Sequence, residues 1–354
     1  MSCFHLFQGR WTRLSLLSVA AGALATVASM AAPSVAGVVT FGSGTNEFQM
    51  EFVTIGNPGN ADDFTGSNPR PAGAVAYEYG LGKFEVSEDM INKFNASQSL
   101  QITLADMSPF GGNGDNKPAT AVSWNEAARF VNWLNTSTGG FAAYKFTTDG
   151  VNDNIDLWTA ADMLDYEATN PYRSKRATYV LPSTNEWYKA AYYNPNDGTY
   201  YFFPTGSDAI PTAVASGTGT GVNGNNEAVY GGQLGPADVD QAGGLSPYGV
   251  MGLGGNVREW EESAMDLANG GSPSSNSSGS STRGLRGGEW SDYDGSMRST
   301  HRGLADPSSE DNSLGFRVAS LSSDAPPAVP EPSMMVIGTL FGLGGLVAKR
   351  RMKK

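Results

Sequence analysis

The chain has 354 residues, of which 45 are glycine and only 16% are charged, and its formal charge is −12. One cysteine and two histidines exclude a disulfide framework, which needs cysteine pairs, and a zinc site built from cysteine and histidine. The ends are basic, +2 over residues 1–36 and +4 over residues 331–354, so the part between carries −18; such a segment repels phosphate backbones, and we expect no nucleic-acid partner.

The first 36 residues are typical of a secretory signal peptide. Two arginines precede an apolar stretch over residues 14–32, and small residues allow cleavage after Ala32 or after Ala36. We therefore expect export across the inner membrane, with an uncleaved membrane anchor as the alternative. The single cysteine and the first histidine would leave with the signal, so the mature chain would keep no cysteine and one histidine.

Three segments predict helices by their capping signals. A serine precedes a glutamate by three residues at Ser123 and at Ser183, which is the pattern of a capping box, and apolar residues follow each at helical spacing. Ser87 is followed by two acidic residues, which the helix dipole favours in a first turn.

Strands and loops are predicted between these helices. Short apolar runs predict strands at residues 75–79, 81–86, 178–181, 200–203 and 316–319. Stretches rich in glycine, asparagine and serine predict loops at residues 56–74, 217–235 and 268–282. Few regular elements among long loops favour one α+β domain over a doubly wound sheet.

The C-terminus has three features in a fixed order. Pro330-Glu331-Pro332 is followed by an uncharged stretch over residues 333–348 and a basic tail over residues 349–354. The stretch is short for a membrane span of about 20 residues, although flanking basic side chains can reach the membrane surface. The basic tail would stay on the cytoplasmic side, which leaves the acidic part outside.

This C-terminal pattern resembles the PEP-CTERM sorting signal of Gram-negative bacteria. The resemblance implies a temporary anchor that a membrane protease of the exosortase type cuts, so this protease is the expected partner during export. The expected location is then the cell surface or the extracellular space. We assign residues 1–36 to the signal peptide, 37–325 to one domain and 326–354 to the sorting signal with its short transmembrane helix.

Five sequence motifs follow one another across the middle part. They are GKFEVS at 82–87, PATAVSWNEAARFVNWL at 118–134, LPSTNEWYKAA at 181–191, YGVMGLGGNVREWE at 248–261, and a segment at 285–318 that opens with LRGGEW and closes with LGFRV. In this order they resemble the formylglycine-generating enzyme, or sulfatase-modifying factor, family. The resemblance spans about residues 52–320 and implies a C-type-lectin-like α+β fold.

The resemblance does not extend to the catalytic residues of that family. Its catalytic members oxidise a substrate cysteine with two copper-binding cysteines that follow the Gly-Gly-x-Trp segment, here Gly287–Trp290. Asp292 lies near the first of these positions and Gly295–Met297 near the second, so no thiolate is present for copper, which prefers sulfur ligands. A related branch holds iron with histidines, and one histidine cannot form such a site. We expect neither copper nor iron.

The ligand cleft is expected around Trp290, with Arg286, Asp292, Arg298 and His301 as its polar residues. The arginines gathered towards the end of the domain could clamp an anion. Because the domain is so acidic, we expect them instead to pair with internal carboxylates; they are Arg286, Arg298, Arg302 and Arg317.

The resemblance also implies a calcium site around the Gly-Asn-x-x-Glu-Trp segment. It places backbone-carbonyl ligands on Gly255 and Val257 and a side-chain ligand on Glu259, whereas the family's Asn/Asp position falls on Gly252, which has no side-chain oxygen. Calcium needs several oxygen ligands, so the site is expected to be weakened unless water fills the gap. In the alternative interpretation, Glu259 and Asn256 only tie loops together.

These observations favour an exported, catalytically silent member of the family that acts in binding or matrix assembly at the cell surface. Its expected partner is extracellular polysaccharide or an envelope component. One alternative is an enzyme of unrecognised chemistry in the same cleft, with Glu289, Asp292 or His301 as its acting group. Another is a purely structural surface protein with no ligand.

Overall fold

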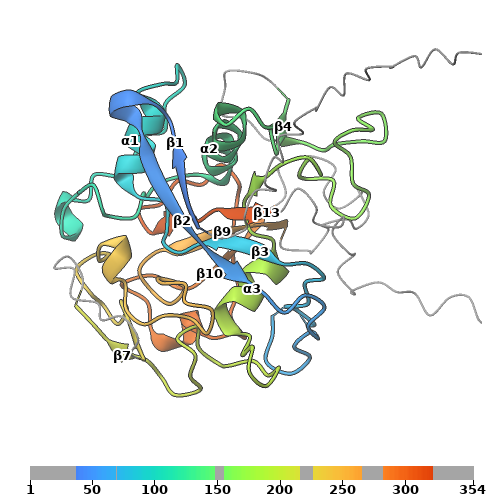
Figure 1. The fold of residues 1–354 in the computed structure, drawn as a ribbon. Helices are drawn as coiled ribbons and strands as arrows, with labels where there is room; N and C mark the ends of the chain where they lie inside the picture. Colours follow the sequence, from blue (N-terminus) through green and yellow to red (C-terminus); the bar gives the residue numbers. More distant parts are fainter. Residues whose placement is uncertain (1–36, 69, 148–154, 216–225, 265–281, 322–354) are drawn as a thin grey trace, which may run out of the picture. The chain divides into compact units, whose positions relative to one another are not determined.

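The computed structural model describes residues 37–321, except residue 69 and residues 148–154, 216–225 and 265–281 (Figure 1). The predicted signal peptide lies outside this range, as does the predicted sorting signal. Within the described ranges, no helix is long and apolar enough to cross a membrane.

Two sheets form the framework of the domain (Figure 1). The five-stranded sheet has the order β1-β2-β3-β13-β6 and is antiparallel throughout. Its strands are β1 (Gly37–Phe41), β2 (Phe48–Ile55), β3 (Tyr79–Gly82), β6 (Tyr179–Val180) and β13 (Ala319–Leu321). The four-stranded sheet has the order β11-β10-β9-β12, in which only β12 runs parallel to β9. Its strands are β9 (Arg258–Ala264), β10 (Arg283–Arg286), β11 (Gly303–Ala305) and β12 (Leu314–Gly315).

Shorter elements complete the described part. Two strand pairs join β4 (Lys145–Phe146) to β5 (Ile155–Asp156) and β7 (Thr212–Ala213) to β8 (Glu227–Ala228). Single 3-10 turns are η1 (Gly44–Asn46), η2 (Ser108–Phe110), η3 (Val239–Gln241) and η4 (Asp294–Met297). Helices, sheets and long connections together give the mixed α+β class that the sequence predicted.

The three predicted helices are present as α1 (Glu88–Asn95), α2 (Trp124–Ser137) and α3 (Thr184–Tyr192). Both capping boxes are confirmed: Ser123 and Ser183 accept from the amide of the glutamate three residues on, and each glutamate accepts from the serine amide in return. Ser87 caps α1 by accepting from the Met90 amide at 3.4 Å.

The strand predictions were less accurate than the helix predictions. β1 and β2 form a hairpin that the sequence analysis missed, although Phe48, Met50 and Phe52 are buried and alternate with exposed Gln49 and Glu51. The predicted strand at 200–203 makes only isolated bridges, and those predicted at 75–79 and 81–86 are replaced by the single strand β3. Residues 56–74 contain no helix or strand where they are described, as predicted, whereas β8 lies inside the loop predicted at 217–235.

One buried ion pair fixes the start of α3. The Glu186 carboxylate accepts from both Arg173 terminal nitrogens, at 2.9 and 3.1 Å, and also from the Tyr77 hydroxyl and the Ser183 amide. Burial alone would raise the pKa of Glu186, but the charge of Arg173 outweighs it and the pKa lies below its ordinary value. The glutamate of the capping box therefore also ties the segment around Arg173 to the start of α3.

We expect Arg173→Met to lower the free energy of unfolding by about 3–5 kcal/mol, because it leaves a buried carboxylate without its cation. Arg176→Met is the matched control: Arg176 pairs with Asp165, but its side chain is 31% exposed, and such a pair contributes about 1 kcal/mol or less. Urea denaturation of both variants measures the difference. Equal losses of unfolding free energy in the two variants would show that the buried pair stabilises the fold no more than the exposed one.

Candidate functional site

Strand β9 carries three buried glutamates, and each is paired with arginine. Glu259 pairs with Arg317. Glu261 lies 2.7 Å from both Arg286 and Arg302. Glu262 is 3.7 Å from Arg173. The prediction that the late arginines pair with internal carboxylates is confirmed for Arg286, Arg302 and Arg317.

The arginines set the protonation state of the middle glutamate. Burial alone would raise the pKa of Glu261, but the charges of Arg302 and Arg286 outweigh it and hold the pKa below its ordinary value. Glu261 is therefore ionised at neutral pH. A buried carboxylate of this kind is tolerated only while its cations stay in place. The two ion pairs of Glu261 therefore hold β9 against β10 and against the start of β11.

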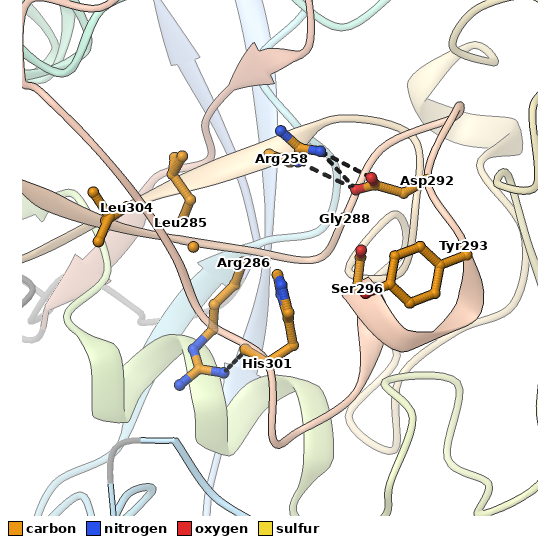
Figure 2. Close-up of a pocket in the computed structure, with 10 residues that line it drawn as sticks. Arg258, Leu285, Arg286, Gly288, Asp292, Tyr293, Ser296, His301 and Leu304 are labelled. Carbon is orange, nitrogen blue, oxygen red and sulfur yellow. Dashed lines mark hydrogen bonds and ion pairs between the residues drawn. The ribbon is translucent and has the colours of Figure 1, made fainter.

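A pocket of about 340 Å³ lies at the end of this sheet where β9 and β11 begin and β10 ends (Figure 2). It is lined by residues of β9, β10, β11 and the segment that leads through η4: Arg258, Leu285, Arg286, Gly288, Asp292, Tyr293, Ser296, His301, Gly303 and Leu304. In Figure 2, Tyr293 and Ser296 lie on one side and Leu285 and Leu304 on the other. The pocket thus combines polar groups with apolar surface, as small-molecule sites do.

The charged groups of the pocket are already paired. Arg258 Nη2 donates to the two carboxylate oxygens of Asp292 at 2.9 and 3.0 Å, and its Nε donates to Asp292 at 3.2 Å (Figure 2). The three guanidinium nitrogens of Arg286 donate to Glu261 and to the backbone carbonyls of His301 and Asn68. Arg258 is therefore matched by a carboxylate of its own, and every guanidinium nitrogen of Arg286 already donates a hydrogen bond.

Two side chains at the pocket are strongly exposed and one is half-buried. Tyr293 is 68% exposed and Leu304 55%. Burial lowers the pKa of His301, and the charges of Arg258 and Arg286 lower it further, whereas Asp292 opposes the shift. His301 is therefore neutral at pH 7, and its Nδ1 is buried without a hydrogen-bond partner.

The structure brings together three of the five residues predicted for the cleft. Arg286, Asp292 and His301 line the pocket. Trp290 is only 3% exposed and packs in an apolar cluster with Met107, Val229, Ala237 and Val257. Arg298 pairs with Asp294 at 2.7 Å and lies over the Phe203 ring, away from the lining.

The cleft predicted from the sequence did not include four further side chains that line the pocket: Arg258, Tyr293, Ser296 and Leu304. Tyr293 had a readable signal, since it lies three residues after Trp290 in a loop segment where an aromatic residue has no periodic partner. The sequence contains no comparable signal for Arg258, because its carboxylate partner Asp292 is 34 residues away along the chain.

The residues present do not fit the redox metals of the family. Asp292 at the first cysteine position is held by Arg258, and Met297 near the second is buried. Over the described ranges, no group of three or more His, Cys, Asp or Glu side chains could hold a metal ion.

Glu259, the predicted calcium ligand, is already saturated with donors. Its carboxylate accepts from Arg317 Nε at 2.6 Å and from the Trp187 indole at 2.7 Å, in addition to Arg317 Nη2. A calcium ion at Gly255, Val257 and Glu259 would have to displace a guanidinium. The donor set described here therefore fits calcium poorly.

The missing side chain at Gly252 is explained by Glu85. A Cβ at position 252 would lie 2.5 Å and 2.6 Å from the two Glu85 carboxylate oxygens, so this carboxylate fills the space of a side chain. Glu85 is buried; one oxygen accepts from Asn256 Nδ2 at 2.9 Å and the other has no partner. Burial and the neighbouring Glu259 raise the pKa of Glu85 to about 8, against the opposing charge of Arg317. Glu85 is therefore a neutral acid at pH 7.

The sequence predicted calcium binding, whereas the contacts of Glu259 in the structure predict none. Thermal melting distinguishes these two expectations. Because Arg317 already neutralises Glu259, we expect equal midpoints in calcium and in chelator. A ligand that binds the folded state raises the midpoint, so a higher midpoint in calcium than in magnesium or chelator would restore calcium at Gly255, Val257 and Glu259.

The buried acid predicts a pH-dependent stability. Between the ordinary pKa of a glutamate and the value of about 8 in the folded chain, the unfolded chain has lost this proton and the folded chain keeps it. The free energy of unfolding therefore falls as pH rises through this window, by on the order of 1 kcal/mol per pH unit.

Glu85→Gln should remove that slope, so that its stability relative to the unsubstituted chain grows from pH 5 to pH 8. Glu51→Gln, a change at an exposed carboxylate on β2, is the control and should follow the parent. Urea denaturation at several pH values measures both. Parallel profiles for Glu85→Gln and the parent would contradict a buried neutral acid.

Comparisons with known proteins agree with this architecture. The family model described as "Sulfatase-modifying factor enzyme 1-like domain" matches residues 25–321. Among solved structures, Treponema denticola variable protein 1 is similar with a TM-score of 0.53 at 20% identity, over 81% of this chain and 99% of that chain. The structure of CarF is similar with a TM-score of 0.51 at 19% identity, over 77% and 98%. At these identities the likeness shows the fold alone. No curated protein matches the chain significantly.

Proposed function

The chain belongs to the sulfatase-modifying factor family, whose domain covers residues 25–321, and we propose that this member binds saccharides at the cell surface and does not catalyse an oxidation. The observation that carries the proposal is the pocket over β9, β10 and β11, where paired polar groups lie beside an exposed aromatic ring. The pocket has the size and the mixed lining of a small-molecule site.

The lining matches the two surfaces of a sugar ring. A pyranose presents an apolar face of C–H groups and an edge of hydroxyl groups. The exposed Tyr293 ring can cover the first, while Arg258, Asp292 and Ser296 offer donors and acceptors to the second. Trp290, around which the cleft was expected, is buried, so Tyr293 is the aromatic residue that can stack on a sugar.

Catalytic silence is supported by the occupants of the family's catalytic positions. Asp292 stands near one cysteine position and is bound to Arg258, and no thiolate is present beyond Cys3 in the predicted signal peptide. Copper chemistry of the family type has no thiolate ligand in this domain.

The enzymatic alternative would need a positioned acid or base in the pocket. The Asp292 carboxylate already accepts hydrogen bonds from Arg258 and from the Glu289 amide. In the part of the chain that the structure describes, no hydrogen bond joins the His301 ring to the Asp292 carboxylate, the contact that a histidine base needs for orientation. These contacts favour binding over catalysis.

Cell-surface location is supported by the two ends of the sequence. The apolar N-terminal stretch and the Pro-Glu-Pro, uncharged and basic order at 330–354 would direct export and temporary anchoring, with an exosortase-type protease as partner. The proposal also includes the C-type-lectin-like fold that the family resemblance implies for the domain. The ligand would then be extracellular polysaccharide or another envelope glycan.

Binding to an array of neutral and acidic oligosaccharides, followed by calorimetry on those that bind, tests the proposal. We expect Tyr293→Ala to weaken saccharide affinity about tenfold, since an aromatic face contributes on the order of 1 kcal/mol beyond its area. No binding to any saccharide would overturn the proposal.

The matched control is Phe141→Ala. Phe141 is an exposed aromatic residue between α2 and β4, and none of the elements that line the pocket contains it. Its loss should leave saccharide affinity unchanged. Equal effects of the two substitutions would place the ligand outside the pocket.

A further inference from the structure

Arg258 is the one pocket arginine that a ligand could reach, and carboxylates surround it. Its side chain is 34% exposed. Besides the contacts with Asp292, its Nη2 lies 3.4 Å from Glu289 Oε1. Over the described residues its Nη1 donates to no protein atom, so this nitrogen remains available as a hydrogen-bond donor from a group whose charge is balanced.

The second arginine offers a ligand nothing further. Arg286 is buried, and its three nitrogens donate to Glu261 and to the backbone carbonyls of three residues, Asn68, Ser299 and His301. Its charge is shared with Arg302 across Glu261. The pocket therefore contains two guanidinium groups, but only Arg258 has a nitrogen left for a ligand, and Asp292 matches its charge.

The pairing of Arg258 with Asp292 decides which class of saccharide can bind favourably in the pocket. A uronate must give up water around its carboxylate, and a cation without a carboxylate partner offsets that cost most effectively. Arg258 is bound to Asp292, and the part of the chain between the basic ends carries −18, which repels acidic polymers over longer range. A neutral hydroxyl can instead accept from Nη1 and donate to a carboxylate oxygen.

We propose that Asp292 determines the class of saccharide that this pocket binds: by neutralising Arg258 it restricts the pocket to uncharged sugars and excludes uronates. The inference rests on the proposed saccharide-binding function and adds a specificity residue to it. Discrimination of this kind works through the repulsive element, here the Asp292 carboxylate, as much as through attraction.

Asp292→Asn tests the assignment as a change of specificity. The amide oxygen can still accept from the Glu289 amide, which keeps the local turn, while Arg258 loses its main counter-charge. Affinities for a neutral hexasaccharide that the array identifies and for a hexauronate are measured by calorimetry on the full chain. We expect the unsubstituted protein to prefer the neutral sugar, and Asp292→Asn to shift the affinity ratio towards the uronate by about tenfold or more.

Two further variants separate charge from general disturbance. Arg258→Gln combined with Asp292→Asn should lose the gained uronate affinity, because the freed guanidinium is gone. Asp294→Asn frees Arg298 from a comparable pair at 2.7 Å outside the pocket lining, and it should leave the affinity ratio unchanged. Circular dichroism and melting confirm that each variant is folded.

The outcomes distinguish the two levels of proposal. Equal or tighter binding of the uronate by the unsubstituted protein overturns the role of Asp292 while saccharide binding stands, and this measurement needs no variant. A folded Asp292→Asn chain with an unchanged ratio overturns it as well. Absence of binding to both sugars in every variant overturns the saccharide-binding function itself, and the inference with it.

Discussion

The structure depends on the neutralisation of three buried carboxylates on one strand. Glu259, Glu261 and Glu262 lie within β9. The arginines that pair with them come from the segment around Arg173, from β10, from the residue before β11 and from the segment after β12. Because an unpaired buried charge is costly, these distant parts of the chain must all be in place together. The pocket is built on this network: Arg258 begins the same strand, and Arg286 joins the network to the pocket lining.

Helices and fold class could be predicted from the sequence, because their signals are local. Each capping box contains both of its partners within four residues, and the structure has both boxes. Strand positions were harder to predict, since strands of two to four residues are set by distant partners and not by their own periodicity. The hairpin of β1 and β2 is the exception: the alternation in β2 was present in the sequence and was missed. Family membership was recognisable from five ordered motifs, and the match over residues 25–321 agrees with it.

The candidate site could be located from the sequence but not assembled from it. The Gly-Gly-x-Trp segment marked the right region, and Arg286, Asp292 and His301 line the pocket. Which of two nearby aromatic residues faces the solvent could not be read from the sequence, because the turn around Gly288 sends Trp290 into the interior and leaves Tyr293 outside. Pairings such as Arg258 with Asp292 join segments that only the fold brings together. The pairing of Arg258 in the pocket is therefore a tertiary property.

The contact between Glu85 and Gly252 has a consequence for how this family member can change over time. The carboxylate of residue 85 occupies the volume that a side chain at residue 252 would need, so the two positions share a single space. Gly252 also has a φ of +77°, a backbone conformation that residues with a side chain rarely adopt, so shortening residue 85 would remove the contact but not the strain. Among close homologues glycine should accordingly persist at 252, even where residue 85 is small.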